Sequence, residues 1–310
     1  RGDDSPMKQF NDITIIGIDQ GYGNMKTANT IFPTAITAYD TAPMFKGDVL
    51  EYGGKFYRVG EGHKGFVADK STDGDFYLLT LAAIAKELEQ YRLFTASLCL
   101  SVGLPLSWVG SQRESFRQYL MQNETIRFRF NGNLFQLRIV GCKVYPQGYA
   151  AIVQQLADFE GEHLLADIGN GTMNLLYLTD SQPQENRCWT EKIGVNQCMI
   201  RAKEAVLRRF GSKISDSTVE QVLRTGTAKI DVDYLACIRE VAASYVAELF
   251  AALRSYEYDP ATTHLTIVGG GGQLIKHFGS YDPEQFTIVD DICAAAKGYE
   301  YMAYRQMLRG

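Results

Sequence analysis

The sequence lacks several patterns that would assign it to a common class of protein. Its six cysteines form no C-x-x-C pair, so they indicate neither a metal site nor a redox motif. No apolar stretch approaches the roughly 20 residues that a membrane-spanning helix needs, and no signal peptide opens the chain. The phosphate-binding pattern G-x-x-x-x-G-K-[ST] is also missing. We therefore expect reduced cysteines in the core, a cytoplasmic location and no membrane contact.

The chain also has no excess of basic residues. It carries 31 Lys and Arg against 36 Asp and Glu, which gives a formal net charge of −5. Nonspecific DNA binding normally requires a basic surface that displaces counterions, so no direct contact with nucleic acid is expected. With 310 residues, 45% of them hydrophobic, the chain is long enough for a large core divided between two domains.

Two glycine-rich segments of similar form lie about half a chain apart. DQGYGNMK begins at Asp19 and DIGNGTMN begins at Asp167, and each follows a short apolar run typical of a buried strand. One such segment alone is common in ordinary hairpins. Two copies in matching context indicate a pair of hairpins that bind one polyphosphate from both sides.

The residue types in these segments suit phosphate and Mg²⁺. Glycine adopts positive φ without steric penalty, so we expect tight turns whose backbone N–H groups point at phosphate oxygens. Mg²⁺ is usually held through one or two carboxylates together with the phosphates, which suits Asp19 and Asp167. Lys26 supplies a positive charge. A third glycine cluster, residues 269–272, lies between the strand-like LTIV and the helix-like QLIKHF, where a nucleotide is commonly received.

Together these segments resemble the actin, Hsp70 and sugar kinase superfamily of ATPases, and within it the prokaryotic actin-like proteins of the ParM (StbA) type. The resemblance spans residues 13 to 302 in the family's order. The segments that carry it are IIGIDQGYGNMK, SVGLPLSW, VYPQGYAA, LLADIGNGTMNLLYL, IVGGGGQLI and DDICAAAKGYEYM.

The resemblance implies an α/β fold with two actin-like (ribonuclease H-like) domains and a nucleotide in the cleft between them. Residues 1–6 look like a remnant left by cloning. The expected divisions are domain I at 7–161, with a small subdomain at about 36–94, domain II at 162–288, and a C-terminal helix at 289–310 that returns to domain I.

The resemblance also implies site residues, with ATP or ADP and Mg²⁺ as cofactors. Asp19 and Asp167 would bind Mg²⁺, largely through water, and Asp167 and Gln147 would be catalytic, with Gln147 orienting the attacking water. The nucleotide contacts implied are Asp19, Gly21, Tyr22, Gly23, Asn24, Lys26, Gly169, Asn170, Gly171, Thr172, Asn174, Gly269, Gly270 and Gly271.

Two positions depart from the family pattern. Tyr22 replaces a serine found in many actins, and Asn174 replaces the histidine of conventional actin. We expect the Tyr22 ring to pack beneath the loop. The effect of Asn174 on the hydrolysis rate stays open.

The expected function is an actin-like ATPase that polymerises with ATP bound and hydrolyses it, as in plasmid segregation, where a separate DNA-binding adaptor would be its partner. A small-molecule kinase of the same fold is an alternative, with Asp167 as base and the loop 60–75 lining a substrate pocket. A nucleotide switch without filaments is another, although the chain has no room for a peptide-binding domain. Gln147 favours hydrolysis, because an amide can hold a water but cannot accept a proton. Preference for ATP over GTP and the filament architecture stay open.

Local patterns predict further elements. Hairpins are expected at residues 53–54 and 131–132. Helices are expected at about 111–121 and 232–255, and a strand-to-helix unit is expected through VYPQGYAAIVQQLADF.

Overall fold

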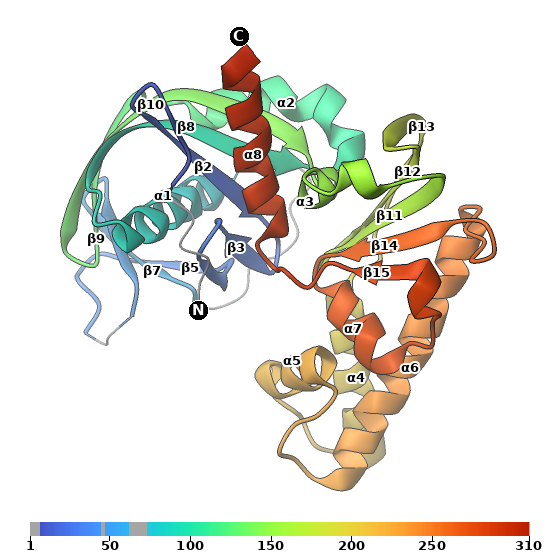
Figure 1. Ribbon diagram of the computed structural model, residues 1–310. Helices are drawn as coiled ribbons and strands as arrows, with labels where there is room; N and C mark the ends of the chain where they lie inside the picture. The colour runs from blue at the N-terminus through green and yellow to red at the C-terminus, as the bar shows by residue number, and fades with distance from the viewer. Residues whose placement is uncertain (1–6, 45–46, 62–72, 310) are drawn as a thin grey trace. The chain divides into compact units, whose positions relative to one another are not determined.

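The computed structural model describes residues 7–44, 47–61 and 73–309 (Figure 1). The segment 1–6 and most of the loop 60–75 lie outside the described residues. The chain forms two compact units, one of residues 1–154 with 293–310 and the other of residues 155–292. Each unit is built on a β-sheet with helices packed against it, so the fold is mixed α/β.

The first unit is built on a ten-stranded sheet with the order β4-β3-β2-β8-β10-β9-β6-β7-β5, and β1 pairs with β2. β2, β8 and β10 are neighbouring parallel strands, so their carboxyl ends lie at one edge of the sheet. The strands are β1 (Gln9–Phe10), β2 (Ile13–Gln20), β3 (Asn24–Lys26), β4 (Ile31–Pro33), β5 (Ile36–Tyr39), β6 (Val49–Tyr52), β7 (Lys55–Val59), β8 (Thr95–Leu104), β9 (Thr125–Phe130) and β10 (Asn133–Pro146).

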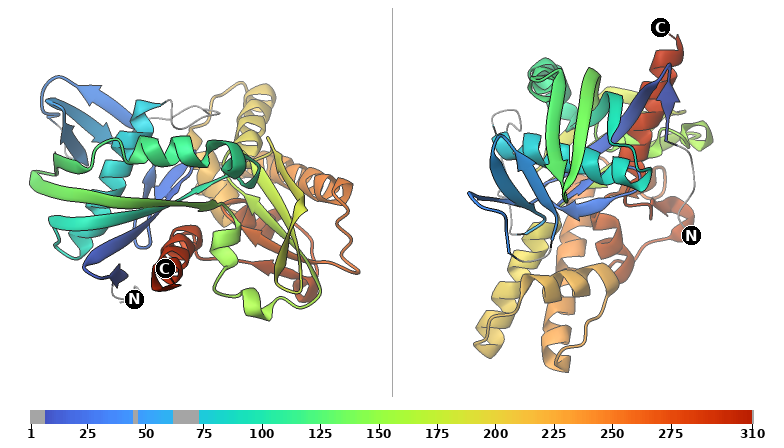
Figure 2. Two further views of the ribbon diagram at one scale, coloured as in Figure 1. Left: turned by 90° about the horizontal axis from the view of Figure 1, so that it is seen from above. Right: turned by 90° about the vertical axis from the view of Figure 1, so that its left-hand side faces the viewer.

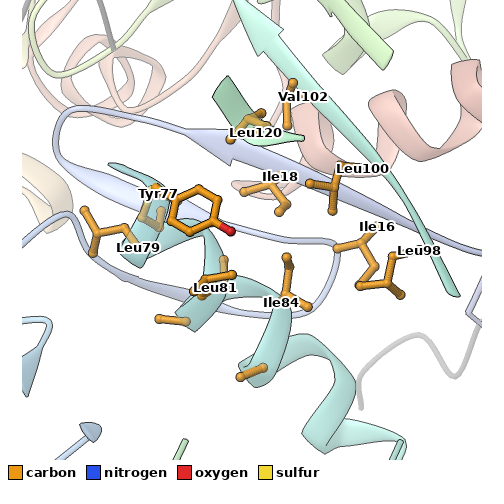
Figure 3. Close-up of a cluster of buried hydrophobic side chains, with 14 of the residues drawn as sticks. Ile16, Ile18, Tyr77, Leu79, Leu81, Ile84, Leu98, Leu100, Val102 and Leu120 are labelled. Atoms are coloured by element: carbon orange, nitrogen blue, oxygen red, sulfur yellow. The ribbon is translucent and has the colours of Figure 1, made fainter. Parts of the chain in front are cut away.

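Helices cover both faces of this sheet. On one face, α1 (Gly74–Gln90) and α2 (Leu106–Leu120) pack on β2, β8 and β10 through aliphatic side chains from alternate strand positions (Figure 3). On the other face, α8 (Ala294–Arg309) packs on β2 and β8. Figure 2 shows that α8, at the end of the chain, lies beside strands from its beginning.

The second unit has a five-stranded sheet with the order β13-β12-β11-β14-β15. Four helices cover one face of it (Figure 1). The elements are β11 (Glu162–Ile168), β12 (Met173–Thr179), β13 (Gln182–Glu191), α4 (Val195–Phe210), α5 (Asp216–Thr225), α6 (Val232–Ser255), β14 (His264–Val268), α7 (Gly271–Phe278) and β15 (Phe286–Ile288), with short 3₁₀ turns at Leu156–Asp158 and Pro283–Gln285.

Several local predictions are confirmed. Gly53 and Gly54, at φ 61° and 76°, connect β6 to β7, and Asn131 and Gly132, at φ 51° and 84°, connect β9 to β10. These left-handed conformations explain why the first turn is Gly-Gly and the second is Asn-Gly. The long helix predicted at 232–255 is α6.

Two helix predictions are wrong in extent. After Gln147 the chain forms only α3 (Tyr149–Ile152), because it leaves the first unit two residues after this helix ends. The helix predicted from residue 111 begins at Leu106, since Pro105 ends β8 and its fixed φ allows a helix to start at once.

None of the described helices combines the length and apolar character that crossing a bilayer requires. Five of the cysteines are buried and Cys188 is half-buried.

Candidate functional site

The first glycine-rich segment forms the β2–β3 hairpin, and its loop is held by one side chain. The Thr34 hydroxyl donates to the Gly21 carbonyl oxygen at 2.6 Å, and the Thr34 backbone N–H donates to the Gly23 carbonyl at 3.0 Å. A trans peptide holds its C=O and N–H in opposite directions, so the Tyr22 N–H points to the side of the loop away from Thr34. Thr34 therefore orients the peptide dipoles of this loop.

Glycine is needed in this loop for space. A Cβ at Gly21 would lie 2.6 Å from the Asn24 carbonyl oxygen. The prediction of left-handed turn glycines is wrong for both hairpins, because neither Gly21 and Gly23 nor Gly169 and Gly171 has a positive φ. The close approach of the backbone to itself replaces that reason at Gly21, whereas a Cβ at Gly169 would make an ordinary contact 3.5 Å from the Thr172 carbonyl oxygen.

Asp19 and Lys26 face each other across the base of the first hairpin. They are register partners on β2 and β3, and Lys26 Nζ lies 2.9 Å from Asp19 Oδ2. Their side chains are 11% and 17% exposed, so the pair is largely removed from water. Such a pair places a carboxylate and an ammonium beside the loop in fixed positions, as a phosphate and metal site requires.

Tyr22 packs against α1. Its ring meets the Phe76 ring edge-to-face, with centroids 6.1 Å apart. The ring therefore packs against a helix, as expected, and its position relative to a bound phosphate stays a prediction.

The second segment forms the β11–β12 hairpin, which Gly169 closes by donating its N–H to the Thr172 carbonyl at 2.8 Å. The first turn of α4 supports this loop. Val195 N–H donates to the Gly169 carbonyl at 3.0 Å, and Asn196 N–H donates to the Asn170 carbonyl at 2.9 Å. The helix thereby satisfies two of its own unpaired N–H groups and directs the N–H groups of residues 170 and 171 away from itself.

Gly194 allows α4 to approach the loop this closely. A Cβ at Gly194 would lie 2.4 Å from the Asn170 carbonyl oxygen and 2.7 Å from the Gly171 carbonyl carbon. Any larger residue would push the helix away from the loop.

Asp167 ends β11 next to the third glycine cluster. Its Oδ1 lies 2.9 Å from where a Cβ of Gly269 would be, and Gly269 adopts φ 84°. A Cβ at Gly271 would lie 2.3 Å from the Ile168 side chain, whereas Gly270 is exposed. The second hairpin and the cluster that opens α7 are therefore in contact, as the carboxyl ends of the parallel strands β11 and β14 require.

Asn174 lies beside Asp167 on the sheet face opposite the helices. It is the register partner of Asp167 on β11 and of Thr190 on β13. The Thr190 hydroxyl donates to Asn174 Oδ1 at 2.9 Å, and Asn174 is buried. Three polar side chains thus follow one another across three strands. Thr172 is also buried, and Asn170 is exposed at the tip of the loop.

Gln147 follows β10 at the same sheet edge as Asp19. Its backbone N–H donates to the Leu104 carbonyl at 2.8 Å, and its Nε2 lies 3.5 Å from the Gly103 carbonyl oxygen. Gly103 is surrounded, since a Cβ there would lie 1.8 Å from the Tyr299 hydroxyl and 2.9 Å from Gln147 Cγ. The carboxyl ends of β2 and β10, with β8 between them, bring Asp19 and Gln147 to one edge.

A buried carboxyl group lies under β2. Glu300 on α8 is 6% exposed, and its Oε1 accepts the Gly17 backbone N–H at 3.1 Å. Burial raises the pKa of Glu300 to about 7, assisted by the charge of Glu87 and opposed by the Gly17 hydrogen bond, Lys8 and Lys297. A Cβ at Gly17 would lie 2.0 Å from the Ala296 carbonyl oxygen, so α8 packs directly on the strand that ends in Asp19.

Sequence reasoning missed the supports of both loops. Thr34, Gly194, Thr190 and Glu300 all act across the fold, and no local pattern marks them. Gly194 before an amphipathic helix was the one available signal. Within the described residues, no group of three or more His, Cys, Asp or Glu could hold a metal ion by itself.

Comparison with known proteins identifies the fold. Residues 17–149 match the family model of the actin-like proteins' N-terminal domain. The chain is similar to an archaeal actin homolog, Ta0583, with 20% identity, a TM-score of 0.73, and 94% of this chain and 99% of that chain covered. The same homolog has been solved in complex with ADP. No curated protein sequence matches the chain.

Two further solved structures are similar over almost their full length. An apo ParM protein of psk41 has 15% identity and a TM-score of 0.71, with 96% of this chain and 100% of that chain covered. The Alp12 filament structure has 17% identity and a TM-score of 0.69, with 96% and 99% covered. The predicted resemblance in fold is thereby confirmed: residues 17–149 match the N-terminal domain of the actin-like proteins, and the chain as a whole has the actin-like fold.

Proposed function

We propose that this protein binds MgATP, hydrolyses it and polymerises into dynamic filaments. One observation carries the proposal. Each of the two hairpin loops follows an aspartate and has carbonyl groups that are already hydrogen-bonded, by Thr34 in one loop and by the first turn of α4 in the other. This arrangement directs the N–H groups of Tyr22 and Asn24 in one loop, and of residues 170 and 171 in the other, away from those partners. Such N–H groups can bind phosphate oxygens.

The first unit contributes the loop at residues 21–24 and the ion pair behind it. The loop N–H groups bind phosphate oxygens. Lys26, 2.9 Å from Asp19, would supply positive charge for the phosphates, and Asp19 would supply a carboxylate for Mg²⁺.

The second unit contributes the loop at residues 169–172, Asp167 and the glycines at 269–271. Asp167 would supply a carboxylate for Mg²⁺, and the glycine cluster that Asp167 touches would hold the adenosine. Mg²⁺ bound with the phosphates would neutralise the charge that develops on them during hydrolysis.

Gln147 holds the attacking water. Its backbone is fixed to Leu104 and its side chain packs beside Gly103, which leaves the amide at the edge where Asp19 also lies. An amide can orient water but cannot accept its proton, so hydrolysis is favoured over transfer to a substrate hydroxyl. This argues against a kinase of the same fold.

Filament formation is proposed from the fold. The similar Alp12 protein has been solved as a filament, and another similar structure is a non-polymerisable mutant of a ParM protein. We extend this to plasmid segregation in the cytoplasm, with a separate DNA-binding adaptor as partner. The net charge of −5 suits an indirect attachment to DNA.

Right-angle light scattering after addition of MgATP tests the proposal, with phosphate release followed in the same cuvette. The expected result is a rise in scattering that decays as phosphate appears. Phosphate release without scattering over a wide range of protein concentration would replace the filament with a non-polymerising nucleotide switch. If neither signal appears, a kinase without its acceptor becomes the better explanation.

Two controls make the experiment specific. Addition of EDTA before ATP should abolish both signals, because the carboxylates bind the nucleotide through Mg²⁺. Replacement of ATP by GTP in a parallel series measures the base preference.

A further inference from the structure

The polar row across β11, β12 and β13 contains one residue to which no role has been given. Asp167, Asn174 and Thr190 are successive register partners on the sheet face opposite the one that packs in the helical core of this unit. Their neighbours Ile168, Met173 and Trp189 point to the opposite face and pack in the core. Next to the second loop, this face of the sheet therefore carries hydrogen-bonding side chains instead of apolar ones.

The hydrogen bond between Thr190 and Asn174 fixes the direction of the amide. Thr190 Oγ1 donates to Asn174 Oδ1 at 2.9 Å, and this oxygen is the only acceptor of the Asn174 side chain. With Oδ1 held toward β13, the Nδ2 group points away from β13. Asn174 is 6% exposed, so few other rotamers are open to it.

An amide held in this way presents donors only. An oxygen that carries negative charge, on a phosphate or on an attacking water, is the group that such donors stabilise. Water in bulk would let the amide rotate, whereas a buried amide with one end fixed is oriented before the ligand arrives.

We propose that Thr190 is a positioning residue for ATP hydrolysis, which acts by holding the Asn174 amide so that Nδ2 donates to the γ-phosphate or to the attacking water. The inference rests on the proposed ATPase function. It explains how asparagine serves at a position where conventional actin has histidine: the threonine on the next strand gives the shorter side chain a fixed direction.

The test compares phosphate release and ATP affinity in matched variants. Thr190→Val keeps the shape of the side chain and removes the hydroxyl, so kcat should fall about tenfold or more while KM and ATP affinity stay unchanged. Thr190→Ser restores the hydroxyl and should recover most of kcat. Thr266→Val is the control, because Thr266 is also buried on this face of the sheet and its hydroxyl has no hydrogen-bond partner among the described residues.

A double variant separates positioning from sheet stability. If Thr190 acts only through Asn174, Thr190→Val added to Asn174→Ala should lower kcat no further than Asn174→Ala alone. A further tenfold loss in the double variant would show that Thr190 acts by another route and would overturn the inference.

The outcomes distinguish the inference from the proposed function. Absence of phosphate release from the unaltered protein removes the proposed function, and the inference with it. If the unaltered protein is active and its Thr190→Val variant keeps the same kcat, the inference alone is wrong. The inference alone is also wrong if Thr190→Val lowers both kcat and thermal stability and Thr190→Ser does not restore kcat.

Discussion

The buried carboxyl group of Glu300 should make the stability of the first unit depend on pH. Its pKa is raised from 4.5 to about 7, because α8 holds it against β2 at 6% exposure. A folded state with a raised carboxyl pKa binds its proton more tightly than the unfolded state. The contribution to stability is therefore fully present below pH 4.5 and is lost as pH rises through 7.

The magnitude follows from the linkage relation. A pKa shift from 4.5 to about 7 means that Glu300 contributes at most about 3 kcal/mol to the free energy of unfolding. Between pH 8 and pH 5 the folded protein should gain about 2.5 kcal/mol from this group. Glu300→Gln is neutral at every pH and keeps an acceptor for the Gly17 N–H, so it should be more stable than the unaltered protein at pH 8. The difference should shrink by about 2.5 kcal/mol at pH 5.

Urea unfolding followed by tryptophan fluorescence measures this difference. The chain has two tryptophans, Trp108 in α2 and Trp189 in β13, one in each unit. A Trp189→Phe background leaves Trp108 as the only reporter, and it reports on the unit that contains Glu300. Histidines and other carboxyl groups titrate in both proteins, so their effects cancel in the comparison. Parallel pH profiles, or a Glu300→Gln variant that is less stable at pH 8, would refute the reasoning.

The remaining predictions concern the proposed site. Asp167→Ala should abolish phosphate release, and Gln147→Ala should slow it while ATP binding stays within about twofold in a filter-binding assay; normal turnover would remove either residue from the chemistry. Gly194→Ala places a methyl group 2.4 Å from the Asn170 carbonyl oxygen, and the resulting overpacking of about 1–3 kcal/mol should weaken ATP binding tenfold or more. Gly110→Ala, a helical glycine with open space around it, is the control and should leave binding unchanged.

The fold class was predictable from the sequence because the buried strands and turns leave local signals. The apolar run before Asp19 and the paired glycines at 53–54 each specify an element without reference to the rest of the chain. The actin-like fold was predictable from the order of six such segments. The short α3 was not, because its end depends on where the chain passes from one unit to the other.

The candidate site was predictable only in part for a related reason. Asp19 and Asp167 stand at strand ends beside glycines, and this pattern is visible in the sequence. The groups that support the site come from distant positions in the sequence. Thr34 and Glu300 can be identified only from the atoms that they contact in the folded structure. A local sequence pattern marks the residues that a ligand would contact, whereas the residues that support them are known only once the fold is known.

The two loops are similar in sequence and different in how they are held. One has its carbonyls bound by a single threonine, and the other has them bound by the first turn of α4. If the shared sequence arose from packing, similar loops would need similar neighbours. Because the neighbours differ while the aspartate and the glycines recur, packing inside the protein does not account for the shared residues. Binding of phosphate oxygens by each loop, as we propose, would account for them.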